Sequence, residues 1–214
     1  MRECLTDLRS ARNPKARIKI MEGHFATVNS HINTYIDMST VKCRHNNGRE
    51  TARVLAEHFR NNTMVDTIVC LDGTEVIGTF MAEFLSDRGI MSINSGNNIS
   101  IITPDVNAYG QLVFMDSTIR MIKNMQVLVL AASVTTGRTI AQAAEAVSYY
   151  GGTVGGVAAI FSNVEQTPEE MEIFSIFHKE DLPDYQAYQP SECPMGRRKQ
   201  PLDAIVNSFG YSKL

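Results

Sequence analysis

Residues 127–140 constrain the fold of this 214-residue chain more than any other segment. Residues 127–132 form an apolar run that is typical of a buried strand. Small residues follow at 133–137, and from Arg138 onward apolar residues recur with the period of a helix. A buried strand that passes through a short loop into a helix is the repeating unit of a parallel sheet covered by helices.

The loop in this segment predicts an anion site. The first N–H groups of a helix have no partner within the helix, and the helix dipole favours negative charge at that end. Threonine hydroxyls add further donors. We therefore expect phosphate to be bound by Ser133, Val134, Thr135, Thr136, Gly137, Arg138 and Thr139. The alternative is an ordinary turn with a threonine-rich cap, with Arg138 on the helix surface.

Comparable patterns recur along the chain and predict an α/β fold. We expect strands at 34–38, 66–71, 99–103, 111–114, 153–161 and 172–177. We expect further helices at 52–59 and 76–88, the second ending at Gly89. No element is assigned to 1–23. The result is one domain over 1–214, with a parallel sheet of about five strands and helices on both faces.

A second loop follows the expected strand at 66–71. It consists of Asp72, Gly73, Thr74 and Glu75. Ligands of open α/β sheets bind outside the carboxyl ends of the strands, so neighbouring loops there could hold two separated phosphate groups. The alternative is a helix cap with Thr74 as N-cap. A Gly-x-Gly-x-x-Gly or Walker loop is absent from the sequence, which disfavours a dinucleotide fold or a P-loop NTPase.

Composition excludes several classes of function. The net charge of −3 and the lack of a basic stripe argue against nucleic-acid binding. No apolar run approaches the roughly 18 residues of a membrane span, and no signal-peptide core is present, so we expect a cytoplasmic protein. The four cysteines are scattered without C-x-x-C spacing, which argues against a zinc site or a disulfide framework. Cys193 as a nucleophile is disfavoured because no paired histidine is evident.

Residues 127–140 resemble the motif of the type I phosphoribosyltransferases that binds 5-phosphoribosyl 1-diphosphate (PRPP). In that family a strand leads into a Thr-Thr-Gly-x-Thr-like loop that holds the 5′-phosphate. Gly23 to Phe25 followed by Tyr35, together with the tail around Cys193 and Pro201, resembles the orotate phosphoribosyltransferase branch. The resemblance covers about residues 20–205. It implies a Rossmann-like sheet, an N-terminal hood at 1–40, and a C-terminal tail at 181–214.

The same resemblance implies roles for other segments. Residues 72–75 would contact pyrophosphate, and 99–114 would form a flexible hairpin whose turn at 104–110 carries Asn107, Tyr109 and Gly110. His31 and Tyr35 would lie near the base. The implied partners are PRPP or a nucleotide 5′-phosphate, a small-molecule base and Mg²⁺ that arrives with PRPP. A homodimer is also implied. No metal is expected in the protein alone, and no catalytic residue is assigned.

The chain departs from the family pattern at important positions. The acidic pair of the PRPP motif, which would hold the ribose hydroxyls, falls on Ala131 and Ala132. The hairpin carries no basic residue, which argues against orotate because orotate is an anion. Two functions therefore stay open: a phosphoribosyltransferase that joins a nitrogenous base to PRPP, or a non-catalytic sensor of PRPP or a nucleotide.

Overall fold

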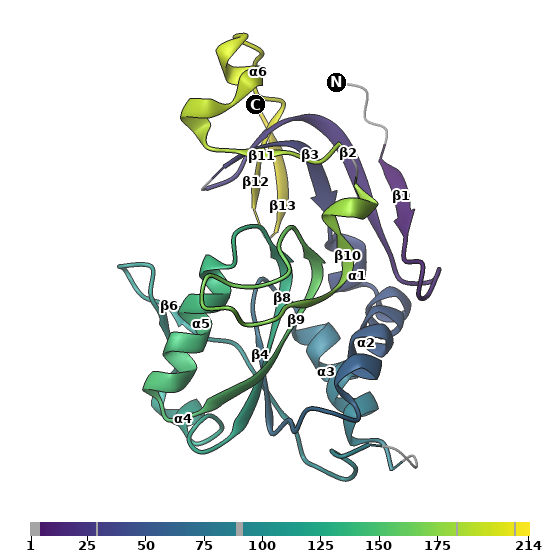
Figure 1. The fold of residues 1–214 in the computed structure, drawn as a ribbon, viewed down its shortest axis with the longest axis vertical. Coiled ribbons are helices and arrows are strands. Elements are labelled where there is room, and N and C mark those ends of the chain that lie inside the picture. Colours follow the sequence, from purple (N-terminus) through teal and green to yellow (C-terminus); the bar gives the residue numbers. More distant parts are fainter. Residues whose placement is uncertain (1–4, 29, 89–91, 183, 208) are drawn as a thin grey trace.

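The computed structural model describes residues 5–28, 30–88, 92–182, 184–207 and 209–214. The chain forms two main sheets. One is a parallel sheet flanked by helices, and the other lies beyond the carboxyl ends of its strands (Figure 1). We call the second one the hood sheet. Both described ends of the chain lie in or beside it.

The parallel sheet confirms the predicted fold class. Its strand order is β10-β9-β8-β4-β5, and every pair of neighbours is parallel. The strands are β4 (Thr67–Cys70), β5 (Ser100–Ile102), β8 (Gln126–Val134), β9 (Thr153–Ser162) and β10 (Phe174–His178). Strands in such a sheet are buried on both faces, which is why β4 and β8 were recognisable as continuous apolar runs.

Helices cover the two faces of the parallel sheet. On one face lie α2 (His45–Phe59) and α3 (Glu75–Ser86), and on the other α5 (Arg138–Tyr149) and the short α4 (Asp116–Ile119) (Figure 1). Side chains of β4 alternate between these layers: Ile68 packs in the cluster with α2 and α3, and Val69 packs in the cluster with α5. The helix expected at 76–88 is α3, which begins at Glu75 and ends at Ser86. Its expected stop, Gly89, lies outside the described residues.

The hood sheet draws strands from both ends of the chain. Its main path is β11-β3-β2-β12-β13, and β1 also pairs with β2. The strands are β1 (Thr6–Arg9), β2 (Arg17–Ala26), β3 (His31–Asp37), β11 (Ala187–Tyr188), β12 (Ala204–Asn207) and β13 (Gly210–Lys213). The sequence patterns indicated β3 but missed the other five. Leaving 1–23 without an element was wrong, since β1 and most of β2 lie there.

Residues 100–113 form a hairpin that differs from the expected one. β5 joins the parallel sheet, whereas β6 (Asp105–Val106) pairs with β7 (Leu112–Val113) as a separate two-stranded ribbon. The strands expected at 99–103 and 111–114 therefore belong to different sheets. The remaining elements are α1 (Ser39–Cys43), α6 (Pro194–Arg197) and 3₁₀ turns at Lys179–Asp181 and Pro190–Glu192.

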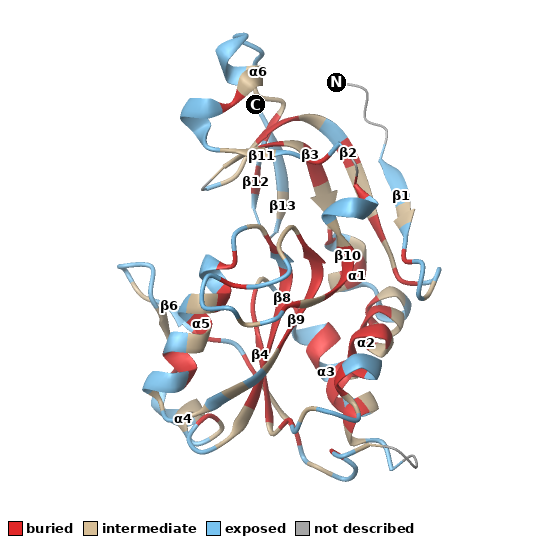
Figure 2. Cartoon of the chain, in the orientation of Figure 1, coloured by how far each residue is buried: buried red, intermediate tan, exposed pale blue. Residues whose placement is uncertain are grey.

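One hydrophobic cluster extends from the parallel sheet into the hood. It includes Leu128 and Phe161 from the parallel strands, and Phe25, Tyr35 and Val206 from the hood. Figure 2 shows the buried residues concentrated in the central strands and along the inner side of the hood. Within the described residues, no helix is both long and apolar enough to span a bilayer.

Candidate functional site

The two loops singled out by sequence lie at the point where the order of the parallel sheet reverses. From β4 the chain passes through α3 to β5 on one side, and from β8 it passes through α5 to β9 on the other. β4 and β8 are neighbours, and the N–H of Leu71 donates to the carbonyl oxygen of Leu130 at 2.8 Å. Such a switch point is where open α/β sheets bind ligands. The two strands are neighbours, which is the condition for their loops to hold two separated phosphate groups.

The loop after β8 is shorter than expected. Ser133 and Val134 belong to the strand, paired in register with Phe161 and Ser162 of β9. Val134 is 3% exposed and packs in the cluster beneath α5. The pairing with β9 continues past the alanines, so the expected loop at 133–137 narrows to residues 135–137.

Gly137 ends this loop in a position that requires glycine. Its φ of 77° is left-handed, and a Cβ there would lie 3.1 Å from the Cα of Thr167. It is the N-cap of α5, and no side chain caps that helix end. The N–H groups of the first turn are thus without intrahelical partners, as an anion site needs. Thr136, Arg138 and Thr139 are exposed beside them.

The loop after β4 is held to β8 by Thr74. The Thr74 hydroxyl is fully buried and lies 2.8 Å from the carbonyl oxygen of Leu71 and 3.2 Å from that of Leu130. Thr74 is the N-cap residue of α3, as the alternative had it, but its side chain makes no cap hydrogen bond. Asp72 and Gly73 both have left-handed backbone, with φ of 57° and 75°. The result is a tight turn fixed against the neighbouring strand.

Two charged groups meet at this turn. The Lys42 ammonium of α1 donates to the carbonyl oxygen of Asp72 at 2.9 Å. Burial raises the pKa of the Asp72 carboxyl, and the Lys42 charge and a hydrogen bond from the backbone of Ala132 partly oppose that rise. Burial in turn lowers the pKa of Lys42, against the attraction of Asp72. Sequence reasoning missed Lys42 because it lies 30 residues before Asp72 and in no motif.

Glu75 connects the same turn to the hairpin. The hydroxyl of Thr103 donates to the Glu75 carboxylate at 2.9 Å, just before β6. At the tip, the Asn107 side-chain oxygen accepts from the N–H groups of Tyr109 and Gln111, at 2.9 and 3.0 Å. Gly110 supplies the positive φ of 77°, and Tyr109 is 89% exposed. The hairpin is therefore anchored at the switch point and presents its tip to solvent.

Ala131 and Ala132 lie at the carboxyl end of β8 on opposite faces of the sheet. Ala131 packs in the cluster beneath α5, and Ala132 packs in the cluster that reaches the hood. Neither offers a polar side chain. Asp72 is the acidic residue whose carboxyl accepts from the Ala132 backbone.

The residues expected near the base both lie in the hood sheet. Tyr35 is 5% exposed and packs edge-on against Tyr211, with ring centroids 5.3 Å apart. Burial raises the pKa of Tyr35 to about 12, helped by the nearby Asp37 and Tyr211. His31 is the first residue of β3, which is roughly 20 Å long. The strand leads into α1, where Lys42 lies. His31 and Lys42 are thus at opposite ends of this segment, and the base-proximal role of His31 and Tyr35 stays a prediction.

Cys193 has the histidine neighbour that the sequence did not reveal. Its Sγ lies 3.4 Å from the Nε2 of His24, which lies 169 residues away in the sequence. The statement that no histidine pairs with Cys193 was therefore wrong. Because the two residues share no local motif, no signal in the sequence could have joined them.

A surface cavity of about 590 Å³ lies away from the switch point, between α2 and α3. Its lining mixes arginines with acidic residues, and Arg49 pairs with Glu83 at 3.2 Å. The guanidinium groups of Arg49 and Arg53 also stack on Phe84. This mixture of charges does not favour a phosphate ligand.

Comparison with known proteins places the fold in a class. No family model matches the chain. The orotate phosphoribosyltransferase of Chlorobaculum parvum is 25% identical over 198 residues, which cover 86% of this chain and 88% of that protein. The Leishmania donovani UMP synthase structure gives a TM-score of 0.55 at 18% identity, covering 77% of this chain and 34% of that one.

Structures of the Mycobacterium tuberculosis orotate phosphoribosyltransferase are also similar. One gives a TM-score of 0.52 at 18% identity and covers 77% of this chain and 92% of that one. Another, solved in complex with PRPP, gives 0.50 at 18% identity and covers 69% and 82%.

The fold is that of the type I phosphoribosyltransferases, and the resemblance drawn from residues 127–140 is confirmed at this level. Within that class, the sequence similarity is to an orotate-type enzyme.

Proposed function

We propose that this protein is a phosphoribosyltransferase of the orotate-like type, which joins a nitrogenous base to PRPP and releases pyrophosphate. The observation that carries the proposal is the position of two glycine-containing turns, after β4 and after β8, at the switch point of the parallel sheet. Two such turns offer backbone N–H groups to two separated phosphate groups, as PRPP presents them. The similar M. tuberculosis enzyme has been solved with PRPP bound.

Each turn has a distinct part in this proposal. The exposed N–H groups at the start of α5, with the hydroxyls of Thr136 and Thr139, bind the 5′-phosphate. The turn at 72–75 contacts pyrophosphate through its backbone, and Lys42 supplies a nearby positive charge. The hairpin tip with Asn107, Tyr109 and Gly110 closes over the ligand and excludes water.

Mg²⁺ is the expected companion of PRPP, and the residues present fit it in part. Mg²⁺ prefers oxygen ligands and is commonly held by one or two carboxylates together with substrate phosphates. Asp72 and Glu75 could provide carboxylates on the pyrophosphate side, and the ion would neutralise the charge of the leaving pyrophosphate. Ala131 and Ala132 provide none on the ribose side. The chain itself therefore contributes chiefly position and backbone donors.

The two alanines favour a second candidate function, a non-catalytic sensor of PRPP or of a nucleotide 5′-phosphate. Without the acidic pair, the chain lacks the charges that the family resemblance assigns to the ribose and to the developing positive charge at its reacting carbon. The phosphate turns do not depend on those side chains. Binding without turnover would follow.

One experiment separates the two functions. PRPP affinity is measured by calorimetry with Mg²⁺, and pyrophosphate release is measured with a panel of purine and pyrimidine bases. Turnover on any base supports the enzyme, and binding without turnover supports the sensor. Absence of binding to PRPP and to nucleoside monophosphates would sink both. Sedimentation at several protein concentrations tests the proposed homodimer.

The double substitution Ala131→Asp and Ala132→Asp tests whether the ribose lies at the end of β8. If it does, two restored carboxylates should tighten PRPP binding in the presence of Mg²⁺. Thermal unfolding must be followed in parallel, because Ala131 is 2% exposed and a buried carboxylate there costs stability. Unchanged or weaker binding by the folded variant would place the ribose elsewhere.

A further inference from the structure

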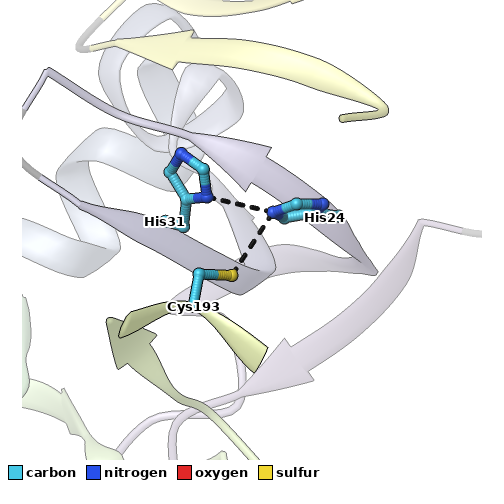
Figure 3. A group of neighbouring side chains, drawn as sticks. All are labelled: His24, His31 and Cys193. Carbon is cyan, nitrogen blue, oxygen red and sulfur yellow. Dashed lines mark hydrogen bonds between the residues drawn. The ribbon is translucent and has the colours of Figure 1, made fainter. Parts of the chain in front are cut away.

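Three side chains that can bind metals converge on one point in the hood. They are His24 of β2, His31 of β3 and Cys193, the residue just before α6 (Figure 3). The Nε2 of His24 lies 3.0 Å from the Nδ1 of His31 and 3.4 Å from the Sγ of Cys193. Each residue directs one ligand atom inward, and these atoms all lie within 4.8 Å of one another.

The partners of His24 determine which ring nitrogen is free to bind. Its Nδ1 lies 3.0 Å from the carbonyl oxygen of Gln200 and 3.3 Å from that of Pro201. Carbonyl oxygens accept hydrogen bonds and cannot donate, so Nδ1 carries the proton and Nε2 presents its lone pair to the other two groups. Histidines that bind metals are commonly held in this way, by a hydrogen bond from the second nitrogen to a backbone carbonyl.

Hydrogen bonding alone leaves this cluster incompletely satisfied. The single lone pair of His24 Nε2 faces two groups, and it can accept from only one of them. His24 and Cys193 are 1% and 0% exposed, whereas His31 is half-buried, so water reaches the cluster only beside His31. A cation between the three atoms would accept a lone pair from each of them.

The sulfur of Cys193 is also held by the backbone. The N–H of Gly196 donates to its Sγ at 3.5 Å. Hydrogen bonds of this kind orient the side chains that bind metals.

We propose that His24 Nε2, His31 Nδ1 and Cys193 Sγ form a binding site for a divalent transition-metal ion, with zinc the best match. Tetrahedral zinc with Zn–N of about 2.0 Å and Zn–S of about 2.3 Å sets ligand atoms roughly 3.3–3.6 Å apart. The separations of 3.0 Å (His24 to His31) and 3.4 Å (His24 to Cys193) are within a few tenths of an ångström of that spacing, and the third pair of atoms lies within 4.8 Å. Two imidazoles and a thiolate suit zinc or copper rather than Mg²⁺, which prefers oxygen. Water would complete the coordination.

Such an ion would tie the C-terminal segment to the hood. Cys193 and the Gln200–Pro201 carbonyls come from the tail, whereas both histidines come from neighbouring hood strands. A ligand that binds the folded state and not the unfolded one raises stability, so the metal would stabilise this junction. The site uses no residue of the two phosphate turns, so metal binding and PRPP binding can be measured separately.

The test uses the full chain, stripped of metal with a chelator and titrated with Zn²⁺ by calorimetry. We expect one equivalent to bind, and thermal unfolding to shift to higher temperature when it does. Co²⁺ in place of Zn²⁺ should give the thiolate-to-cobalt charge-transfer absorption that reports a bound cysteine. Calorimetric titration with PRPP, run on the same samples, reads out the phosphate site separately.

Matched variants locate the site. His31→Gln and Cys193→Ser should weaken Zn²⁺ binding at least tenfold, and Cys193→Ser should abolish the cobalt band. His45→Gln and Cys43→Ser alter exposed residues outside the cluster and should leave both readouts unchanged. His31 is only half-buried, so His31→Gln keeps the test valid if Cys193→Ser unfolds. Less than one equivalent bound, or equal binding by His31→Gln and the native chain, would overturn the proposal.

Discussion

The two sheets of this protein were assembled in different ways. Each strand of the parallel sheet from β4 to β9 is joined to the next by a helix or a hairpin segment, so sheet and helices follow one another along the chain. The hood sheet instead pairs β2 with β12, whose partner residues Phe25 and Ala204 are far apart in sequence. A site on the parallel sheet therefore occupies contiguous loops. A site in the hood combines residues that no local motif contains.

This difference decides which chemistry a sequence reveals. The phosphate turn at the start of α5 depends on a few consecutive residues around Gly137. The His24, His31 and Cys193 cluster depends on β2, β3 and the tail meeting in space.

The largest effect is expected from a side chain that both sheets share. Phe161 at the end of β9 is 1% exposed and packs edge-on against Tyr185 of the tail. Phe161→Ala should cost about 3–5 kcal/mol, because the cavity it leaves collapses only partly. One cluster spans both sheets, so hydrogen exchange should show both losing protection together. Separate unfolding transitions for the two sheets would show that they are independent units.

Gly137→Ala should have the next largest effect, about 1–3 kcal/mol of stability. The left-handed φ strains any other residue, and the new Cβ would press on the backbone of Thr167 at 3.1 Å. PRPP binding should weaken as the turn shifts. Gly96→Ala is the control, since Gly96 has the same φ of 77° with no atom within 4 Å of its Cβ position. Equal losses in both variants would mean that the contact with Thr167 is unimportant.

Asp72→Asn tests the electrostatics of the β4 turn through pH. A carboxyl whose pKa is raised on folding binds its proton more tightly when folded, so stability falls as pH rises from the ordinary Asp value through the raised one. Asparagine removes this loss and keeps the carbonyl oxygen that accepts from Lys42. Urea denaturation across pH should therefore show a flatter profile and higher stability at neutral pH.

The exposed Asp184 provides the control for that series. Asp184→Asn makes the same chemical change at an exposed position and so controls for the loss of one charge. If the two variants have the same pH profile, burial does not affect the Asp72 carboxyl as described.

The smallest effect on stability is expected at the hairpin tip. Asn107→Ala removes the oxygen that accepts from Tyr109 and Gln111. The tip is exposed, so the free energy of unfolding should change by less than about 0.5 kcal/mol. Amide exchange at 109 and 111 should nevertheless accelerate. A large loss of global stability would mean that the ribbon belongs to the core.

Local patterns predicted most of the parallel sheet. β4, β8 and β9 are apolar runs, and α3 and α5 follow short loops, so propensity and burial agree there. At the site, the same patterns located both turns. They extended the β8 loop by two residues, because pairing with β9 is a property of the partner strand and not of Ser133 or Val134.

Most strands of the hood sheet could not be predicted from local sequence patterns, and the reasons are physical. β2 has a register shift between Glu22 and Phe25, so the adjacent His24 and Phe25 are both buried and the alternation typical of a strand is lost. β12 and β13 are only four residues long, and β13 is mostly exposed; β12 joins the sheet by pairing with β2, and β13 by pairing with β12. Lys42 and the Cys193 cluster share this cause, since each acquires its partners only through the folded topology.

The buried hydroxyl of Thr74 has a consequence for selectivity. By contacting the carbonyl oxygens of both Leu71 and Leu130, it holds the turn after β4 at a set spacing from β8, and thus from the turn that follows β8. In the proposed function, a fixed spacing between the two turns would select a ligand whose anionic groups sit at opposite ends of a pentose over a nucleoside diphosphate, whose phosphates are adjacent.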